Sequence, residues 1–109
     1  MEYTNKETME YMRSLYMEGK ISHAKYYLWL ADLVGANYSD IPFDDEKLLN
    51  SKDEHLNDLP LRKWDNMDVL IRRKAYSRGL PWSLSDTVCV LKSLARKKIV
   101  ELQTMSLKN

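Results

Sequence analysis

The sequence predicts an all-α protein: a compact four-helix domain that spans residues 1–109, with an irregular acidic insertion between its second and third helices. Apolar residues recur every three or four positions along four segments, as they do on one face of a helix. No run of alternating β-branched residues occurs, and the three glycines and three prolines fall where helices would start or stop. With 44% apolar and 30% charged residues, the chain is suited to one buried core and is too apolar for wholesale disorder.

The first two helices are expected at residues 5–18 and 23–34. Thr4 followed by Glu7 forms a capping-box pattern at the first start, Ser22 is the N-cap of the second helix, and a glycine follows each helix. The apolar surface of the second helix is wider than a single stripe, which is typical of a deeply buried helix or of one that also faces a partner. Its expected core stripe is Ala24, Tyr27, Leu28, Ala31 and Val34.

Residues 36–58 are the least regular segment and hold the acidic insertion. A structureless loop of that length is uncommon in a compact domain, so we expect one or two short helical turns, the best placed at Asp44–Leu49. Acidic side chains at the start of that turn complement the helix dipole. The insertion lacks the alternating oxygen ligands and the central glycine of a calcium loop, so the sequence predicts no metal site there.

Two longer helices are expected in the C-terminal half, at residues 60–78 and 84–104. Asp58 is the expected N-cap of the first, and Ser83 with Asp86 repeats the capping-box pattern at the second. Both helices carry an apolar stripe whose residues recur every three or four positions. The residues expected to be buried together are Leu28, Trp64, Ile71, Val88, Leu91 and Ala95.

The total charge of +1 conceals a strong asymmetry between the two halves of the chain. Residues 1–60 carry twelve acids and six bases, a net charge of −6, whereas residues 61–109 carry eleven bases and four acids, a net charge of +7. Such an asymmetry predicts a charged macromolecular partner, or two halves that compensate each other within the molecule. Our leading interpretation is a regulator or inhibitor that occupies the surface of a partner protein or nucleoprotein. A homo-oligomer also stays open.

The expected protein-binding residues are three aromatic side chains and three acids of the insertion. Seven Tyr and three Trp are many for a chain of this length, and both types are enriched at interface hot spots. The aromatic candidates lie off or beyond a main apolar stripe, where an exposed ring would serve as an anchor. The six residues are Tyr26, Trp29, Trp82, Asp44, Asp45 and Glu46.

The alternative is nucleic-acid binding through the basic half, in which Lys and Arg are interleaved with aromatic residues. Basic side chains neutralise phosphates, and aromatic rings stack on bases. Cations near helix C-termini are also favoured by the helix dipole, so a solvated basic face explains the pattern as well. A helix-turn-helix around Gly79 is disfavoured, because the start of the last helix carries no basic side chain. The candidate phosphate-binding residues are Arg62, Arg72, Arg73, Arg78, Arg96 and Lys97.

Catalysis is not predicted, because the groups needed for acid–base or nucleophilic chemistry are nearly absent. His23 and His55 are the only histidines, Cys89 is the only thiol, and no phosphate loop, nucleophile elbow or zinc spacing occurs. We therefore expect a protein that is not an enzyme and has no cofactor, metal or small-molecule substrate. The single cysteine suits a reducing compartment, and no segment is apolar enough for a signal peptide or a membrane span. We expect a cytoplasmic protein without membrane contact.

Overall fold

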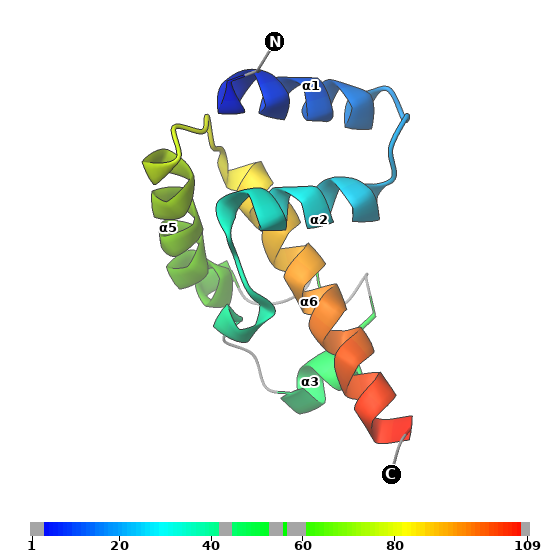
Figure 1. Ribbon diagram of the computed structural model, residues 1–109. Coiled ribbons are helices and arrows are strands. Elements are labelled where there is room, and N and C mark those ends of the chain that lie inside the picture. The colour runs from blue at the N-terminus through cyan, green and yellow to red at the C-terminus, as the bar shows by residue number, and fades with distance from the viewer. Residues whose placement is uncertain (1–3, 42–44, 53–55, 57–60, 108–109) are drawn as a thin grey trace.

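The computed structural model describes residues 4–41, 45–52, 56 and 61–107, and every regular element within these ranges is helical. Four long helices confirm the predicted all-α class. Their ends match the predicted ones or differ by one residue, except that the last helix ends three residues later than predicted. The short turn predicted at Asp44–Leu49 is also confirmed. The elements, labelled in Figure 1, are α1 (Asn5–Met17), α2 (His23–Val34), the 3-10 turn η1 (Tyr38–Asp40), α3 (Asp45–Leu49), α5 (Leu61–Ser77) and α6 (Leu84–Leu107).

The starts of α1 and α6 follow the predicted capping boxes. At α1, Thr4 Oγ1 accepts a hydrogen bond from Glu7 N at 3.1 Å, and Glu7 Oε2 accepts one from Thr4 N at 3.3 Å. At α6, Ser83 Oγ accepts from Asp86 N at 3.3 Å, and Asp86 Oδ2 accepts from Ser83 N at 3.1 Å. Each box satisfies two backbone N–H groups at a helix start. Asp58, the expected N-cap of α5, lies outside the described residues.

Helix α6 is the element around which the others are arranged. It contacts α2, α3, α5 and η1, and its contact with α2 is the most extensive of these. Figure 1 shows α2 crossing the N-terminal half of α6, α5 beside that half, and α3 near the C-terminal end. Because neighbours surround it, α6 buries more than one stripe. Its buried residues are Asp86, Thr87, Val90, Leu91, Ser93, Leu94, Ala95 and Ile99.

The buried face of α2 differs from the predicted stripe. Its core side chains include Tyr26 and Leu30, whereas Leu28 is only half-buried. The expectation that Leu28 and Val88 belong to the core is therefore wrong. Leu28 lies beside the face of α2 that α1 and α6 cover, and Val88 of α6 is likewise only half-buried. The side chain of Trp64 lies outside the described residues. Among the residues expected to be buried together, the confirmed core members are Ile71, Leu91 and Ala95.

Polar contacts join elements that are far apart in the sequence. Arg13 Nη2 of α1 lies 2.6 Å from Asp86 Oδ2 at the start of α6. Arg78 Nη1, just after α5, donates a hydrogen bond to the Leu33 carbonyl of α2 at 2.6 Å, and Asn5 Nδ2 donates to the Arg78 carbonyl at 3.1 Å. These contacts fix α1, α2 and α5 at the N-terminal end of α6.

Candidate functional site

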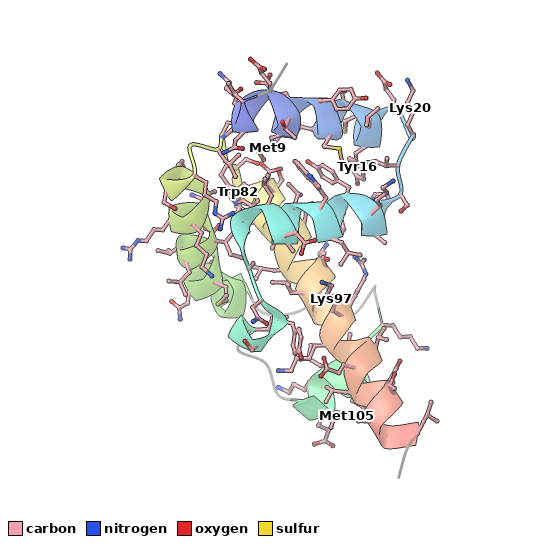
Figure 2. The ribbon with its side chains drawn as sticks, viewed as in Figure 1. Met9, Tyr16, Lys20, Trp82, Lys97 and Met105 are labelled. Atoms are coloured by element: carbon pink, nitrogen blue, oxygen red, sulfur yellow. The ribbon has the colours of Figure 1, made fainter. Side chains whose placement is uncertain are left out.

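A surface hollow of about 280 Å³ opens between α2 and α6. The α2 residues that line it recur at i, i+3 and i+4, and the α6 residues recur at i, i+3, i+4 and i+7. Residues at these spacings share one face of a helix, so two helical stripes border the hollow. Figure 2 shows Lys97 on α6 close to the crossing with α2. We call this hollow the α2–α6 groove; its lining residues are Ala24, Tyr27, Leu28, Ser93, Arg96, Lys97 and Val100.

The groove combines an apolar lining with one buried hydroxyl. Val100 is 60% exposed and contributes an aliphatic side chain to the lining. Ser93 is 3% exposed, and its Oγ has no hydrogen-bond partner among the described residues. A buried hydroxyl without a partner costs about 1–3 kcal/mol. The small side chain at this position leaves room for the hollow, which a longer apolar side chain would fill.

The rim of the groove is cationic. The Arg96 guanidinium carbon lies 5.6 Å from the centroid of the Tyr27 ring, within the range of a cation–π contact. Lys97 is exposed on the same face of α6, and none of the seven lining residues is acidic. A concave surface lined by one sign of charge raises the local concentration of oppositely charged groups. The groove therefore favours a partner that brings carboxylates to its rim.

Tyr27, the aromatic residue of the groove, contacts His23 of its own helix and Tyr16 of α1. The Nδ1 atom of His23 lies 3.4 Å from the Tyr27 hydroxyl and also contacts the Tyr16 hydroxyl. Burial raises the pKa of the Tyr27 phenol well above its ordinary value, and hydrogen bonds to Cys89 and Tyr16 raise it further. The contact with His23 restricts the orientation of the Tyr27 ring, and a ring held in this way loses little conformational entropy when a partner binds.

The structure places two of the predicted aromatic anchors in the core. Trp82 is 8% exposed, and its Nε1 donates a hydrogen bond to Thr87 Oγ1 at 2.6 Å. Tyr26 is 2% exposed and stacks on Tyr16 of α1 with ring centroids 4.6 Å apart. The expectation that Tyr26 and Trp82 are exposed anchors is therefore wrong, because α1 and the α6 start cover them. Trp29 is half-buried against the core.

The acidic candidates are only partly described. Glu46 is exposed on α3, where Leu48 is buried in the core. Asp44 and the side chain of Asp45 lie outside the described residues. A role for these three acids in protein binding stays a prediction.

The basic candidates do not share one surface role. Arg72 Nε pairs with Asp68 Oδ1 at 2.9 Å within α5, and Arg78 holds the α2 carbonyl described above. Arg73 is exposed on α5, whereas the structure brings Arg96 and Lys97 together at the groove. The side chain of Arg62 lies outside the described residues.

Arg96 and Lys97 were predicted as phosphate-binding residues, but the other five lining residues of the groove were not predicted as a site. Ala24 and Leu28 were assigned to the core, and Ser93 and Val100 carried no signal of their own. The feature of the sequence that pointed to this site was the wide apolar surface of α2, which is typical of a helix that also faces a partner. A second exposed apolar set on α5 also escaped prediction: Val69, Leu70 and Tyr76 are 48%, 49% and 62% exposed.

The part of the chain that the structure describes gives no support for a metal site, a membrane span or a reactive thiol. No three His, Cys, Asp or Glu side chains there are grouped to hold a metal ion, and none of the helices there combines the length and apolar character of a bilayer span. Burial raises the pKa of the Cys89 thiol, which lowers its thiolate fraction at neutral pH. The chain matches no protein-family model, no curated protein and no solved structure.

Proposed function

We propose that this protein is a small non-enzymatic binding protein that regulates or inhibits a partner protein by occupying its surface, and that it binds through the α2–α6 groove. The observation that carries the proposal is an apolar hollow with two cations on its lining and no acid. Interface hot spots are anchors that fill such hollows, and complementary charges around them orient the encounter.

The size of the groove favours a protein partner over a free small molecule. Pockets that enclose whole ligands measure roughly 300–1,000 Å³. The groove, at about 280 Å³, is at the small end of that range and is open to solvent, so it suits one or two side chains of a docked segment. The partner segment should carry an apolar or aromatic anchor with carboxylates about one helical turn away, opposite Arg96 and Lys97.

Photocrosslinking from the groove tests this function. Val100 is exposed on the groove lining, so a photoreactive p-benzoyl-phenylalanine at this position should capture the docked segment from a lysate of the native host. We expect a discrete crosslinked product that disappears when Lys97→Glu reverses the charge at the rim. Arg73→Glu makes the same charge change on α5 and should leave the product unchanged. The absence of a discrete product, or equal loss with both charge variants, would contradict the proposal.

Nucleic-acid binding is the second candidate, favoured by the net charge of +7 on residues 61–109. Binding to duplex or single-stranded DNA should then fall steeply with salt. Lys97→Glu and Arg73→Glu should each reduce the slope of log affinity against log salt by about one, as the loss of a phosphate contact does. If the wild-type chain shows no binding at low salt, this candidate is excluded.

A further inference from the structure

The outer face of α1 has the chemistry that the groove should accept. Six exposed residues recur at i, i+3, i+4, i+7, i+10 and i+11 along α1 and its C-cap, so they share one face of the helix. Two of them are large and apolar in part: Tyr11 is 63% exposed and Met17 is 77% exposed. The others are three acids and one serine. We call this set the α1 face: Glu7, Glu10, Tyr11, Ser14, Met17 and Glu18.

The α1 face is directed away from the body of its own molecule. Met9 and Tyr16 project from the opposite side of α1 toward α2, as Figure 2 shows, and Met9 is fully buried there. Helix α1 is the outermost element at its end of the fold (Figure 1). Because α1 is held on α2 through this inner side, its outer face is presented to other molecules and not to the groove of the same chain.

The α1 face and the α2–α6 groove are complementary in shape and in charge. The groove is a hollow with an apolar lining and two cations, and the α1 face is a convex helical ridge with an aromatic ring and three acids. Helix-in-groove recognition uses an amphipathic helix whose apolar side chains enter a hydrophobic groove. In this chain the charge of each surface is opposite to that of the other, which favours the contact between two copies.

We propose that a second copy of this chain docks its α1 face in the α2–α6 groove, with Tyr11 as the apolar anchor and Glu10 opposite Lys97. The contact does not depend on the proposed function. If it is reciprocal, it closes a symmetric dimer, and if it is one-way, it extends into a chain of copies. In either arrangement the second copy covers the groove, so self-association competes with any other protein that binds there.

Sedimentation velocity of the full chain tests this contact. A contact smaller than a standard interface should appear as a rise in sedimentation coefficient over about 10 µM to 1 mM protein. Lys97→Glu and Glu10→Lys should each weaken self-association at least about tenfold, because each places like charges opposite one another. An equimolar mixture of the two variants should restore it, since every contact in the mixed complex again pairs opposite charges. Arg73→Glu is the matched control and should change nothing.

A second variant tests the anchor without altering charge. Tyr11 is exposed, so Tyr11→Ala should leave the thermal unfolding midpoint nearly unchanged while weakening self-association about tenfold, as the loss of a hot-spot side chain does. Sedimentation as a monomer at all concentrations would overturn the inference. So would association that none of these changes affects, or a mixture that does not recover. Because these measurements use only purified chain, their failure leaves the crosslinking test of partner binding intact.

Discussion

Replacing Asp86 with alanine should destabilise the fold by about 2–2.5 kcal/mol, because its carboxylate both caps α6 and holds α1. Asp86 is 4% exposed. Its Oδ2 atom accepts hydrogen bonds from Arg13 Nη2 at 2.6 Å, from Ser83 Oγ at 2.8 Å and from Ser83 N at 3.1 Å. The carboxylate also lies in the first turn of α6, where the helix dipole favours an anion.

The expected magnitude is the sum of two losses. A lost helix cap costs about 1 kcal/mol. A charge-assisted hydrogen bond is worth roughly 1.5–3 kcal/mol, but the side chain of Arg13 is 40% exposed, so water can solvate the guanidinium when Asp86 is removed. That solvation lowers the expected cost of losing the ion pair to about 1–1.5 kcal/mol. For a domain of this size the total should lower the thermal midpoint by about 8–10 °C.

Urea unfolding followed by circular dichroism measures the effect, and a double-mutant cycle isolates the contact. Arg13→Ala should cost about 1 kcal/mol, and the Asp86→Ala/Arg13→Ala pair should cost less than the sum of the single changes by about 1 kcal/mol. Asp65→Ala, at an exposed acid of α5, is the control and should stay within about 0.5 kcal/mol of wild type. If the two single changes add within about 0.3 kcal/mol, the two side chains do not interact and the reasoning fails.

Four further outcomes are expected. Ser93→Ala should stabilise the fold by about 1 kcal/mol in urea unfolding, because it removes a buried unpaired hydroxyl and improves helix propensity; a loss of stability would mean that the hydroxyl is paired. Gly35→Ala should cost about 1–2 kcal/mol, since φ is +68° and a Cβ would lie 3.1 Å from Arg78 Nη2; an unchanged midpoint would contradict this. The Cys89 thiol, whose pKa is raised mainly by burial, should react with iodoacetamide much more slowly than free cysteine at pH 8, and urea should abolish the difference. Because burial raises the pKa of Tyr27 in the folded state above the unfolded value of about 10, its contribution to stability is present below pH 10 and is lost as the pH rises further. The urea midpoint should therefore fall above pH 10, less so in Tyr27→Phe, and equal declines in the two proteins would exclude this phenol as the cause.

Sequence patterns predicted the helices well because the signals that start and stop helices are local. The Thr4–Glu7 and Ser83–Asp86 boxes each place a side chain within one turn of the backbone group that it satisfies. Apolar spacing then located the helices between these caps. Such signals need no knowledge of which other helix packs on which face.

It was harder to predict which face of each helix is buried than to predict where the helices lie. Apart from His23 at its start, α2 has only two polar residues, Lys25 and Asp32, which share one face. The apolar surface that remains is wide, and the part of it that is covered depends on where α1 and α6 lie. The sequence assigned Leu28 to the core and Tyr26 to the surface, whereas the structure has Tyr26 buried and Leu28 on the groove lining. Trp82 was misplaced for a similar reason, since its burial depends on a contact with Thr87 that apolar periodicity does not encode.

Hydroxyl-radical footprinting of the unmodified chain, in complex with the partner that crosslinking identifies, tests most directly whether the α2–α6 groove is the docking surface. The method reports side-chain exposure. Both the α2–α6 groove and the exposed apolar set on α5 carry oxidisable residues. Leu28 and Val100 of the groove should lose reactivity in the complex, whereas Val69 and Tyr76 on the outer side of α5 should keep theirs. Protection of Val69 and Tyr76 with unchanged reactivity at Leu28 and Val100 would contradict the account.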